Sequence, residues 1–271
     1  MNSSSSAQRN RPRRGTQSLE RSIRIIKAIA EHGQFGWQLS DVARHCGLDK
    51  STVFRILSCL VEQRVVRRNT RNERYMPGPL LFELSLSLPA YAAFSAAAEE
   101  RLWKLAKRTG LMANLYYRSG DEAICAVVTG SGATRNYIKL ASRRPMLGTA
   151  AGIAILLAMS KSEARDVVKR NIEALSVHRK EDIPKLKAMY LACQRQGFAI
   201  HESHVVPGIN GIAVAVLDAS SAPIASVVIS ATREELPRSQ FRHVHELLIA
   251  EAQALSSVAA KLFADEAAVK E

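Results

Sequence analysis

The stretch from Gln38 to Leu57 constrains this chain most, because it predicts two short helices joined by a tight turn. Ala43 offers the small side chain that two steeply crossing helices need where they touch. Gly47, four residues later, can adopt the left-handed conformation that the turn requires. The apolar residues around them fall where such a pair buries its inner face: Val42, Cys46, Leu48, Val53, Ile56 and Leu57. The stretch therefore predicts a helix-turn-helix, a motif that places its second helix in the major groove of DNA.

The outer face of the second helix follows from that inner face. The residues that must point outward are Lys50, Ser51, Phe54, Arg55 and Ser58. We expect Arg55 to read a guanine edge, because a guanidinium can bond it bidentately. Ser51 or Thr52 can bond a base or a phosphate, and Lys50 is expected on phosphate.

The flanking segments complete the motif. Apolar spacing predicts a first helix over residues 18–32, which Gly33 ends. Ser40 is expected to cap the short second helix, and Asp49 a third helix that runs to about Gln63.

Two short strands should follow the third helix, over residues 65–68 and 73–76, joined by turn-forming residues. The order of helix, helix, helix and hairpin predicts a winged helix-turn-helix over residues 16–77, with the hairpin as a basic wing. The further candidate DNA contacts are Gln38, Ser40, Arg67, Arg68 and Arg71.

The charge distribution supports a polyanionic partner. Residues 1–76 hold 13 Arg and 2 Lys against 6 acidic residues, a net charge of +9, whereas the other 195 residues carry only +4. Residues 1–15 form a predicted flexible basic arm, which either touches phosphates or is a solvated tail. A three-helix unit can also be a protein-interaction module, and the local charge argues against that alternative.

An anionic membrane is the weaker alternative partner. The longest nearly apolar stretch, residues 147–159, is too short to span a bilayer, and residues 1–15 lack the apolar region of a signal peptide. The widely spaced cysteines form no CxxC pair, which disfavours a zinc ribbon or a disulfide framework; Cys46 and Cys59 are expected to be small core residues. We expect a protein of the reducing cytoplasm.

The rest of the chain predicts a linker helix over residues 78–95, an α+β domain over 96–265 and a short tail over 266–271. Strands that can form an antiparallel sheet are predicted at 114–117, 123–128, 137–141, 199–203, 211–217 and 224–230. Helices are predicted at 90–109, 149–159, 162–170, 182–196 and 238–263.

Signals for catalysis or metal binding are weak. On a strand, His201 and His204 would point to opposite faces, so they would not easily share a metal. No nucleophile elbow, phosphate-binding loop or dinucleotide fingerprint is present. We therefore expect no catalytic residues, no metal site and no cofactor.

Several strings resemble the IclR family of bacterial regulators. In the N-terminal part they are Ser18–Ile23, Leu48–Leu57 and Arg74–Gly78, and in the second domain Pro145–Gly152, Gly197–Ile200 and Pro207–Ala213. They occur in the family's order and with similar separations, so the resemblance covers roughly residues 18–265. It implies a winged helix-turn-helix, a linker helix and a GAF-like effector domain. It also implies dimers that pair into tetramers, and control of catabolic operons, as repressor or activator, in response to small organic or aromatic acids.

The resemblance also implies an effector pocket between the sheet and the loop at residues 148–152. Carried over position by position, its lining is Tyr137, Ala150, Ala151, His201, Gly211, Val228 and Ser230. His201 stands where family members often have an acid, Gly211 where they often have a cysteine, and Ile153 replaces the usual lysine. These departures predict a roomier and differently charged pocket that accepts a ligand larger or more apolar than the smallest acids. Gly211 and Val228 can alternatively be sheet packing alone.

Three functions stay in competition. The leading one is a sequence-specific regulator that binds a palindromic operator and responds to a ligand. The second is a nonspecific or effector-independent DNA-binding protein. The third is an enzyme with an accessory basic domain, which rests only on the presence of a pocket.

Overall fold

The computed structural model describes residues 16–33, 35–176, 180–202 and 207–264. The basic arm and the tail predicted for residues 1–15 and 266–271 lie outside the described residues. The contacts between residues divide the chain into two units, one ending at Leu86 and the other beginning at Ser87.

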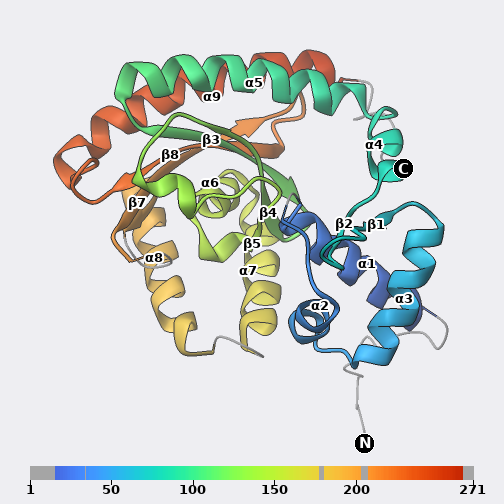
Figure 1. Cartoon of the computed structure of the whole chain (residues 1–271). Coiled ribbons are helices and arrows are strands. Elements are labelled where there is room, and N and C mark those ends of the chain that lie inside the picture. Colours follow the sequence, from blue (N-terminus) through green and yellow to red (C-terminus); the bar gives the residue numbers. More distant parts are fainter. Residues whose placement is uncertain (1–15, 34, 177–179, 203–206, 265–271) are drawn as a thin grey trace, which may run out of the picture. The chain divides into compact units, whose positions relative to one another are not determined.

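The N-terminal unit is a helix-turn-helix followed by a two-stranded hairpin, as the sequence predicts (Figure 1). Its elements are α1 (Gln17–Glu31), α2 (Leu39–Cys46), α3 (Lys50–Glu62), β1 (Val66–Arg68), β2 (Tyr75–Pro77) and α4 (Pro79–Ser85). Fully or nearly buried side chains from α1 to β2 form one apolar core, among them Ile25, Ile29, Val42, Val53, Leu57 and Tyr75.

Trp37 connects the hairpin to the first helix. Its backbone exchanges hydrogen bonds of 2.9 and 2.8 Å with Tyr75 on β2, so it extends the hairpin by one residue pair. Its indole Nε1 donates a 2.8 Å hydrogen bond to the carbonyl oxygen of Ala28 on α1. Trp37 therefore fixes the wing to the rest of this unit, with its backbone bonded to β2 and its side chain bonded to α1.

The C-terminal unit is a six-stranded antiparallel sheet with helices on both faces, which confirms the α+β class (Figure 1). The strand order is β5-β4-β3-β8-β7-β6. The strands are β3 (Met112–Ser119), β4 (Glu122–Thr129), β5 (Arg143–Pro145), β6 (Ala199–Glu202), β7 (Ile209–Leu217) and β8 (Pro223–Thr232), and the helices are α5 (Pro89–Thr109), α6 (Ala150–Ala158), α7 (Lys161–Ser176), α8 (Ile183–Gln196) and α9 (Phe241–Leu262).

The long helices α5 and α9 lie side by side on one face of the sheet, and α6 packs on the other (Figure 1, where α5 is green and α9 red). Arg101 on α5 donates to Glu251 on α9 at 2.8 Å. Because successive strand residues point to opposite faces, each central strand contributes alternately to the two layers. On β3, Tyr117 meets Tyr91 and Phe94 of α5, while Tyr116 points toward the α6 side.

Gly152 permits the close packing that positions α6. A Cβ at this residue would lie 2.2 Å from the backbone oxygen of Met146, much closer than atoms can approach. The absence of a side chain therefore lets the first turn of α6 lie directly on the preceding segment.

Two predicted elements differ in the structure. Residues 137–141 are not a strand: Tyr137 and Leu140 are 60% and 61% exposed, and Ala141 has a φ of +61°, which turns the chain toward β5 instead. The linker segment over residues 78–95 is divided between two helices, since α4 ends at Ser85 and α5 begins at Pro89. Pro89 at the start of α5 suits a new helix, since its missing N–H is not needed there.

Cys59 corrects a further expectation. It is exposed on α3, whereas Cys46 is buried as predicted. Cys59 lies four residues after Arg55, so both share the outer face of the helix. Residue type suggested the core, and helical spacing decided otherwise.

In the part of the chain that the structure describes, no single helix is both long and apolar enough to cross a membrane. Helices α4 and α5 meet that criterion only when taken together, and a break separates them.

Candidate nucleic-acid interface and ligand pocket

The turn between α2 and α3 has the geometry that the sequence predicts. Gly47 ends α2 with a φ of +60°, and nothing lies within 4 Å of where its Cβ would be. Glycine is therefore favoured by backbone conformation and not by lack of space. The N–H of Leu48 donates to the carbonyl of Ala43 at 3.0 Å, which closes the turn.

Asp49 caps α3, as expected. Its Oδ1 accepts hydrogen bonds of 2.7 Å from the backbone N–H of Thr52 and from the hydroxyl of Ser51. The Ser51 hydroxyl and then the Thr52 N–H hold the pKa of Asp49 well below its usual range. The carboxylate is therefore ionised, and it already engages one of the predicted DNA-contacting hydroxyls.

The cap at α2 differs from the prediction. Gln38 is the N-cap residue, and the helix begins at Leu39, so Ser40 lies inside the first turn. Ser40 is half-buried and Gln38 exposed. Neither side chain caps the helix; the Gln38 carbonyl instead accepts from the N–H groups of Asp41 and Val42 at 3.0 and 3.1 Å.

The outer face of α3 carries two cations without internal partners. Lys50, Ser51, Phe54 and Arg55 are exposed, and Thr52 is half-buried. Neither Lys50 nor Arg55 makes a hydrogen bond or ion pair with any residue that the structure describes. Both charges are therefore free to meet an anion.

The arginines of the wing fall into two groups. Arg67 and Arg71 are exposed, and their guanidinium groups bond no described residue. Arg68 forms an ion pair with Glu73 and lies 5.7 Å from the ring centre of Tyr75. Arg74 donates to the carbonyl oxygens of Phe35 and Gly36 at 3.3 and 3.0 Å. Arg68 and Arg74 thus help to hold the wing together, and Arg67 and Arg71 are its available charges.

A shallow hollow of about 300 Å³ joins several predicted contacts. It is lined by residues of α2, α3 and the wing, namely Gln38, Leu39, Ser40, Lys50, Phe54, Arg68, Glu73 and Tyr75. Four of the predicted DNA contacts, Gln38, Ser40, Lys50 and Arg68, therefore share one surface. Arg55 does not line the hollow, but it is exposed on α3 next to Phe54, which does.

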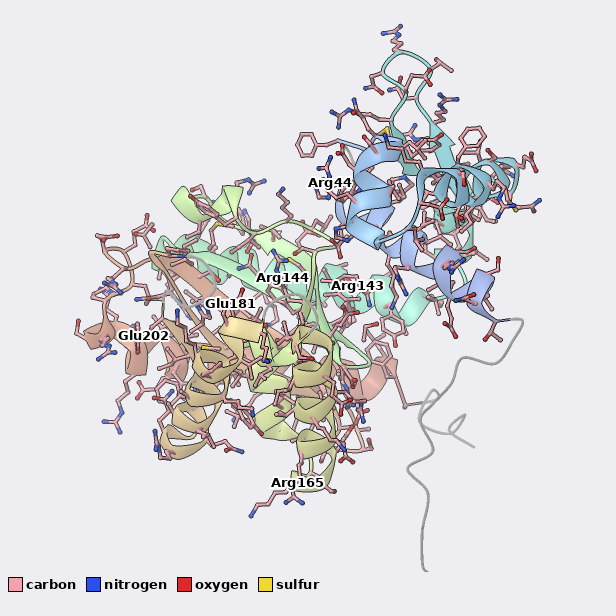
Figure 2. The ribbon with its side chains drawn as sticks, turned by 90° about the horizontal axis from the view of Figure 1, so that it is seen from below. Arg44, Arg143, Arg144, Arg165, Glu181 and Glu202 are labelled. Carbon is pink, nitrogen blue, oxygen red and sulfur yellow. The ribbon has the colours of Figure 1, made fainter. Side chains whose placement is uncertain are left out.

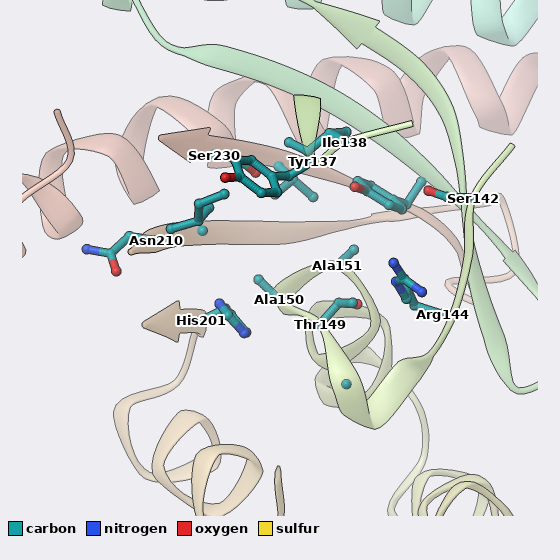
Figure 3. Close-up of a pocket in the computed structure, with 15 residues that line it drawn as sticks. Tyr137, Ile138, Ser142, Arg144, Thr149, Ala150, Ala151, His201, Asn210 and Ser230 are labelled. Atoms are coloured by element: carbon teal, nitrogen blue, oxygen red, sulfur yellow. The ribbon is translucent and has the colours of Figure 1, made fainter. Parts of the chain in front are cut away.

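The candidate ligand pocket of the C-terminal unit lies between the α6 side of the sheet and the loop that precedes β5 (Figure 3). All seven residues expected there line it: Tyr137, Ala150, Ala151, His201, Gly211, Val228 and Ser230. Strand register explains the sheet part, because Gly211 pairs with both His201 and Ser230, and directly paired residues share a face.

Further lining residues were not predicted: Tyr116, Ile138, Ser142, Arg144, Gly148, Thr149, Ile209 and Asn210. Arg144 was missed because the preceding strand was expected at residues 137–141. With no strand predicted at residues 143–145, the alternation that sends Arg144 and Arg143 to opposite faces of β5 could not be predicted either.

The pocket is rich in hydrogen-bond donors. The N-terminal turn of α6 forms one wall, and the N–H groups of Ala150 and Ala151 have no intrahelical acceptor there. Thr149 caps the helix by accepting from the Gly152 N–H at 3.0 Å. Ser230 is 7% exposed, and its hydroxyl bonds no described residue.

Burial raises the pKa of Tyr116 well above its usual range, so its phenol is neutral. The free space is about 100 Å³. Pockets for drug-sized ligands measure about 300–1,000 Å³. The volume favours a compact ligand over the larger one expected from the sequence.

Among the described residues, no three His, Cys, Asp or Glu side chains are placed to hold a metal ion. His245 stacks on Phe198 with ring centres 4.4 Å apart, and burial lowers its pKa. His204 lies outside the described residues.

Comparison with known proteins gives one consistent result. Residues 18–70 match the IclR helix-turn-helix domain, and residues 92–257 match the bacterial transcriptional regulator IclR C-terminal domain. The HTH-type transcriptional repressor AllR of Klebsiella pneumoniae is 26% identical over 249 residues, 90% of each chain. The AllR repressor of Salmonella typhimurium is 25% identical over 240 residues, 87% of each chain.

Solved structures share the fold. An IclR family transcriptional regulator from Brucella abortus superposes with a TM-score of 0.71 at 17% identity, covering 93% of this chain and 96% of that one. An IclR homolog from Microbacterium hydrocarbonoxydans, complexed with 4-hydroxybenzoate, gives a TM-score of 0.65 at 17% identity, covering 89% and 98%.

Proposed function

The chain belongs to the IclR family of bacterial transcriptional regulators, and on that premise we propose that it binds a palindromic operator and adjusts that binding to a small organic or aromatic acid. Its family is one of DNA-binding regulators with a helix-turn-helix and an effector domain, not of enzymes. The observation that carries the proposal is the pairing of two sites: free cations on α3 and the wing, and a donor-rich pocket in the second unit.

The proposed DNA contacts divide by chemistry. Arg55 reads a base edge, because its guanidinium is unpaired on the exposed face of the recognition helix. Lys50, Arg67 and Arg71 meet phosphates and set affinity. Ser51 and Thr52 supply a further hydroxyl contact near the start of α3, and Gln38, Ser40 and Arg68 border the same surface.

A palindromic operator requires two copies of the chain. Large apolar side chains are exposed in and after α4, where a second copy could cover them: Phe82, Leu84, Leu86 and Leu88, at 68, 57, 65 and 48%. We take this segment as the place where dimers form and where ligand binding alters half-site spacing. If a ligand shown to bind leaves the preferred half-site spacing unchanged, this role of the segment is excluded.

Selection of binding sites from a randomised duplex library tests the proposal. The expected motif is an inverted repeat, with an affinity that falls steeply as salt rises. Equal affinity for selected and random duplexes would favour the nonspecific alternative. Binding of 4-hydroxybenzoate and small aliphatic acids is followed in parallel through the melting temperature, which a ligand of the native state must raise.

A further inference from the structure

Among the described residues that line the pocket, Arg144 is the one Arg or Lys, and none is Asp or Glu. Its position follows from β5, where it pairs with Ala123 on β4. Figure 3 shows its guanidinium beside Thr149 and Ala151, at the opposite end of the cavity from His201.

The neighbouring arginine serves as an internal comparison (both are labelled in Figure 2). Arg143 faces the other way and donates to Glu122 at 3.1 and 2.7 Å, so its charge is neutralised within the sheet. Arg144 is exposed and makes no hydrogen bond or ion pair with any described residue. A guanidinium carries five N–H donors, and none of those of Arg144 bonds a described residue.

Several other donors share the cavity with Arg144. They are the first-turn N–H groups of Ala150 and Ala151 and the unpartnered hydroxyl of Ser230. A helix N-terminus favours negative charge. The partner that satisfies all of these groups is an anion rich in acceptor oxygens, and the planar fork of arginine matches a carboxylate.

We propose that Arg144 determines the specificity of this pocket by binding the carboxylate of a compact organic acid, which lies between its guanidinium and the first turn of α6. The proposal rests on the proposed function in taking this pocket as the effector site. It assigns the acid group to one side chain and makes the charge of the ligand, not its hydrocarbon part, the first criterion of selection.

The test uses pairs of probes of nearly the same shape, in which a charged carboxylate is replaced by a neutral amide: lactate and lactamide, and 4-hydroxybenzoate and 4-hydroxybenzamide. Their binding to the full-length protein is measured by melting temperature and calorimetry. The acid of at least one pair should raise the melting temperature, and its amide should not.

Variants then assign the charge. Arg144→Gln should weaken binding of the acid about tenfold or more, as expected for losing hydrogen bonds to a charged group. Arg144→Lys should fall between it and the wild type. The matched control is Arg165→Gln, which removes the same charge from the exposed face of α7, where Arg165 bonds no described residue, and should bind as the wild type does (Figure 2).

Three results would overturn the proposal: no acid stabilises the wild type, acid and amide bind equally, or Arg144→Gln keeps the affinity of the wild type. Without ligand, Arg144→Gln should have the same melting temperature as the wild type. If it is less stable, the acid affinity of Arg144→Lys is used in its place to test the role of Arg144. Operator affinity separates this proposal from the function. If the protein binds its operator but no acid, the Arg144 proposal fails and the DNA-binding function stands. If acids bind through Arg144 but leave operator affinity unchanged, the proposed effector role fails and the Arg144 proposal stands.

Discussion

The carboxylate of Asp49 accepts a 2.7 Å hydrogen bond from the backbone N–H of Thr52, and this contact closes the first turn of α3. The start of the helix sets the rotation of every residue that follows. Val53 and Leu57 therefore point into the core, and Arg55 points outward.

Replacing Arg55 with alanine should relax sequence selection at particular base pairs. A bidentate contact to guanine is worth about 1–3 kcal/mol of discrimination, and Arg55 has no other described partner to keep it away from the groove. Site selection with the wild type and Arg55→Ala would measure the change. An unaltered motif would mean that another residue reads the bases.

Replacing Arg71 with alanine should weaken all sequences about equally. Its free guanidinium on the wing is expected to meet phosphate, so the slope of log affinity against log salt should become shallower by about 1. Titrations of specific and random duplexes at several salt concentrations measure this. Arg74→Ala, which breaks the bonds to Phe35 and Gly36, should instead lower stability, and it serves as a contrast.

Gly152→Ala should destabilise the C-terminal unit by about 1–3 kcal/mol, the range for overpacked cores. The added methyl group would lie 2.2 Å from the Met146 oxygen, which belongs to backbone and cannot swing aside. Denaturant unfolding gives the difference. Gly148→Ala is the control, because a Cβ there meets nothing within 4 Å; equal losses in both variants would contradict the explanation.

Cys59 should react with a thiol reagent in the native protein well before the other cysteines. It is exposed, whereas Cys46, Cys125 and Cys193 are buried, and burial raises the pKa of the Cys125 thiol to about 12. Thiolates are the reactive form, so buried neutral thiols react slowly. The fast phase should vanish in Cys59→Ser, and its persistence would place another cysteine at the surface.

Stability should fall with rising pH in a range set partly by Tyr117. Burial raises the pKa of this phenol from 10.0 to about 12, and its hydroxyl donates to the Tyr91 carbonyl at 3.1 Å. The unfolded chain therefore loses this proton first, and the contribution is complete below pH 10 and lost as the pH rises toward 12. Urea unfolding across this range should show a weaker pH dependence for Tyr117→Phe. Identical profiles would show that Tyr117 titrates normally in the folded protein.

Local patterns predicted the parts of the molecule in which one face of an element is buried. The inner face of the helix-turn-helix, the Asp49 cap and the antiparallel sheet all follow from residue spacing and turn chemistry. Position-by-position resemblance was enough to place the seven predicted lining residues around one pocket, because paired strands hold Gly211, His201 and Ser230 in fixed register.

Contacts distant in sequence could not be predicted in this way. The alternation of residues 137–141 resembles a strand, but the positive φ of Ala141 and the short pairing of β5 decide the path of that segment. Even within the hairpin, residue type predicted Arg68 as a DNA contact and could not show its ion pair with Glu73. The position of Arg144 in the pocket depends on β5 and its pairing with β4, which local sequence patterns did not predict.

The pocket is lined by two kinds of structure. Paired strands and the tightly packed start of α6 form one side, while the other side is the segment around Tyr137 and Ile138, which belongs to no strand. Loops tolerate substitution far better than packed elements do. If the pocket binds the proposed acid, mutations in that segment would change which acid is accepted while the core stays intact. Related regulators could then diverge in the ligand they bind and keep the same fold.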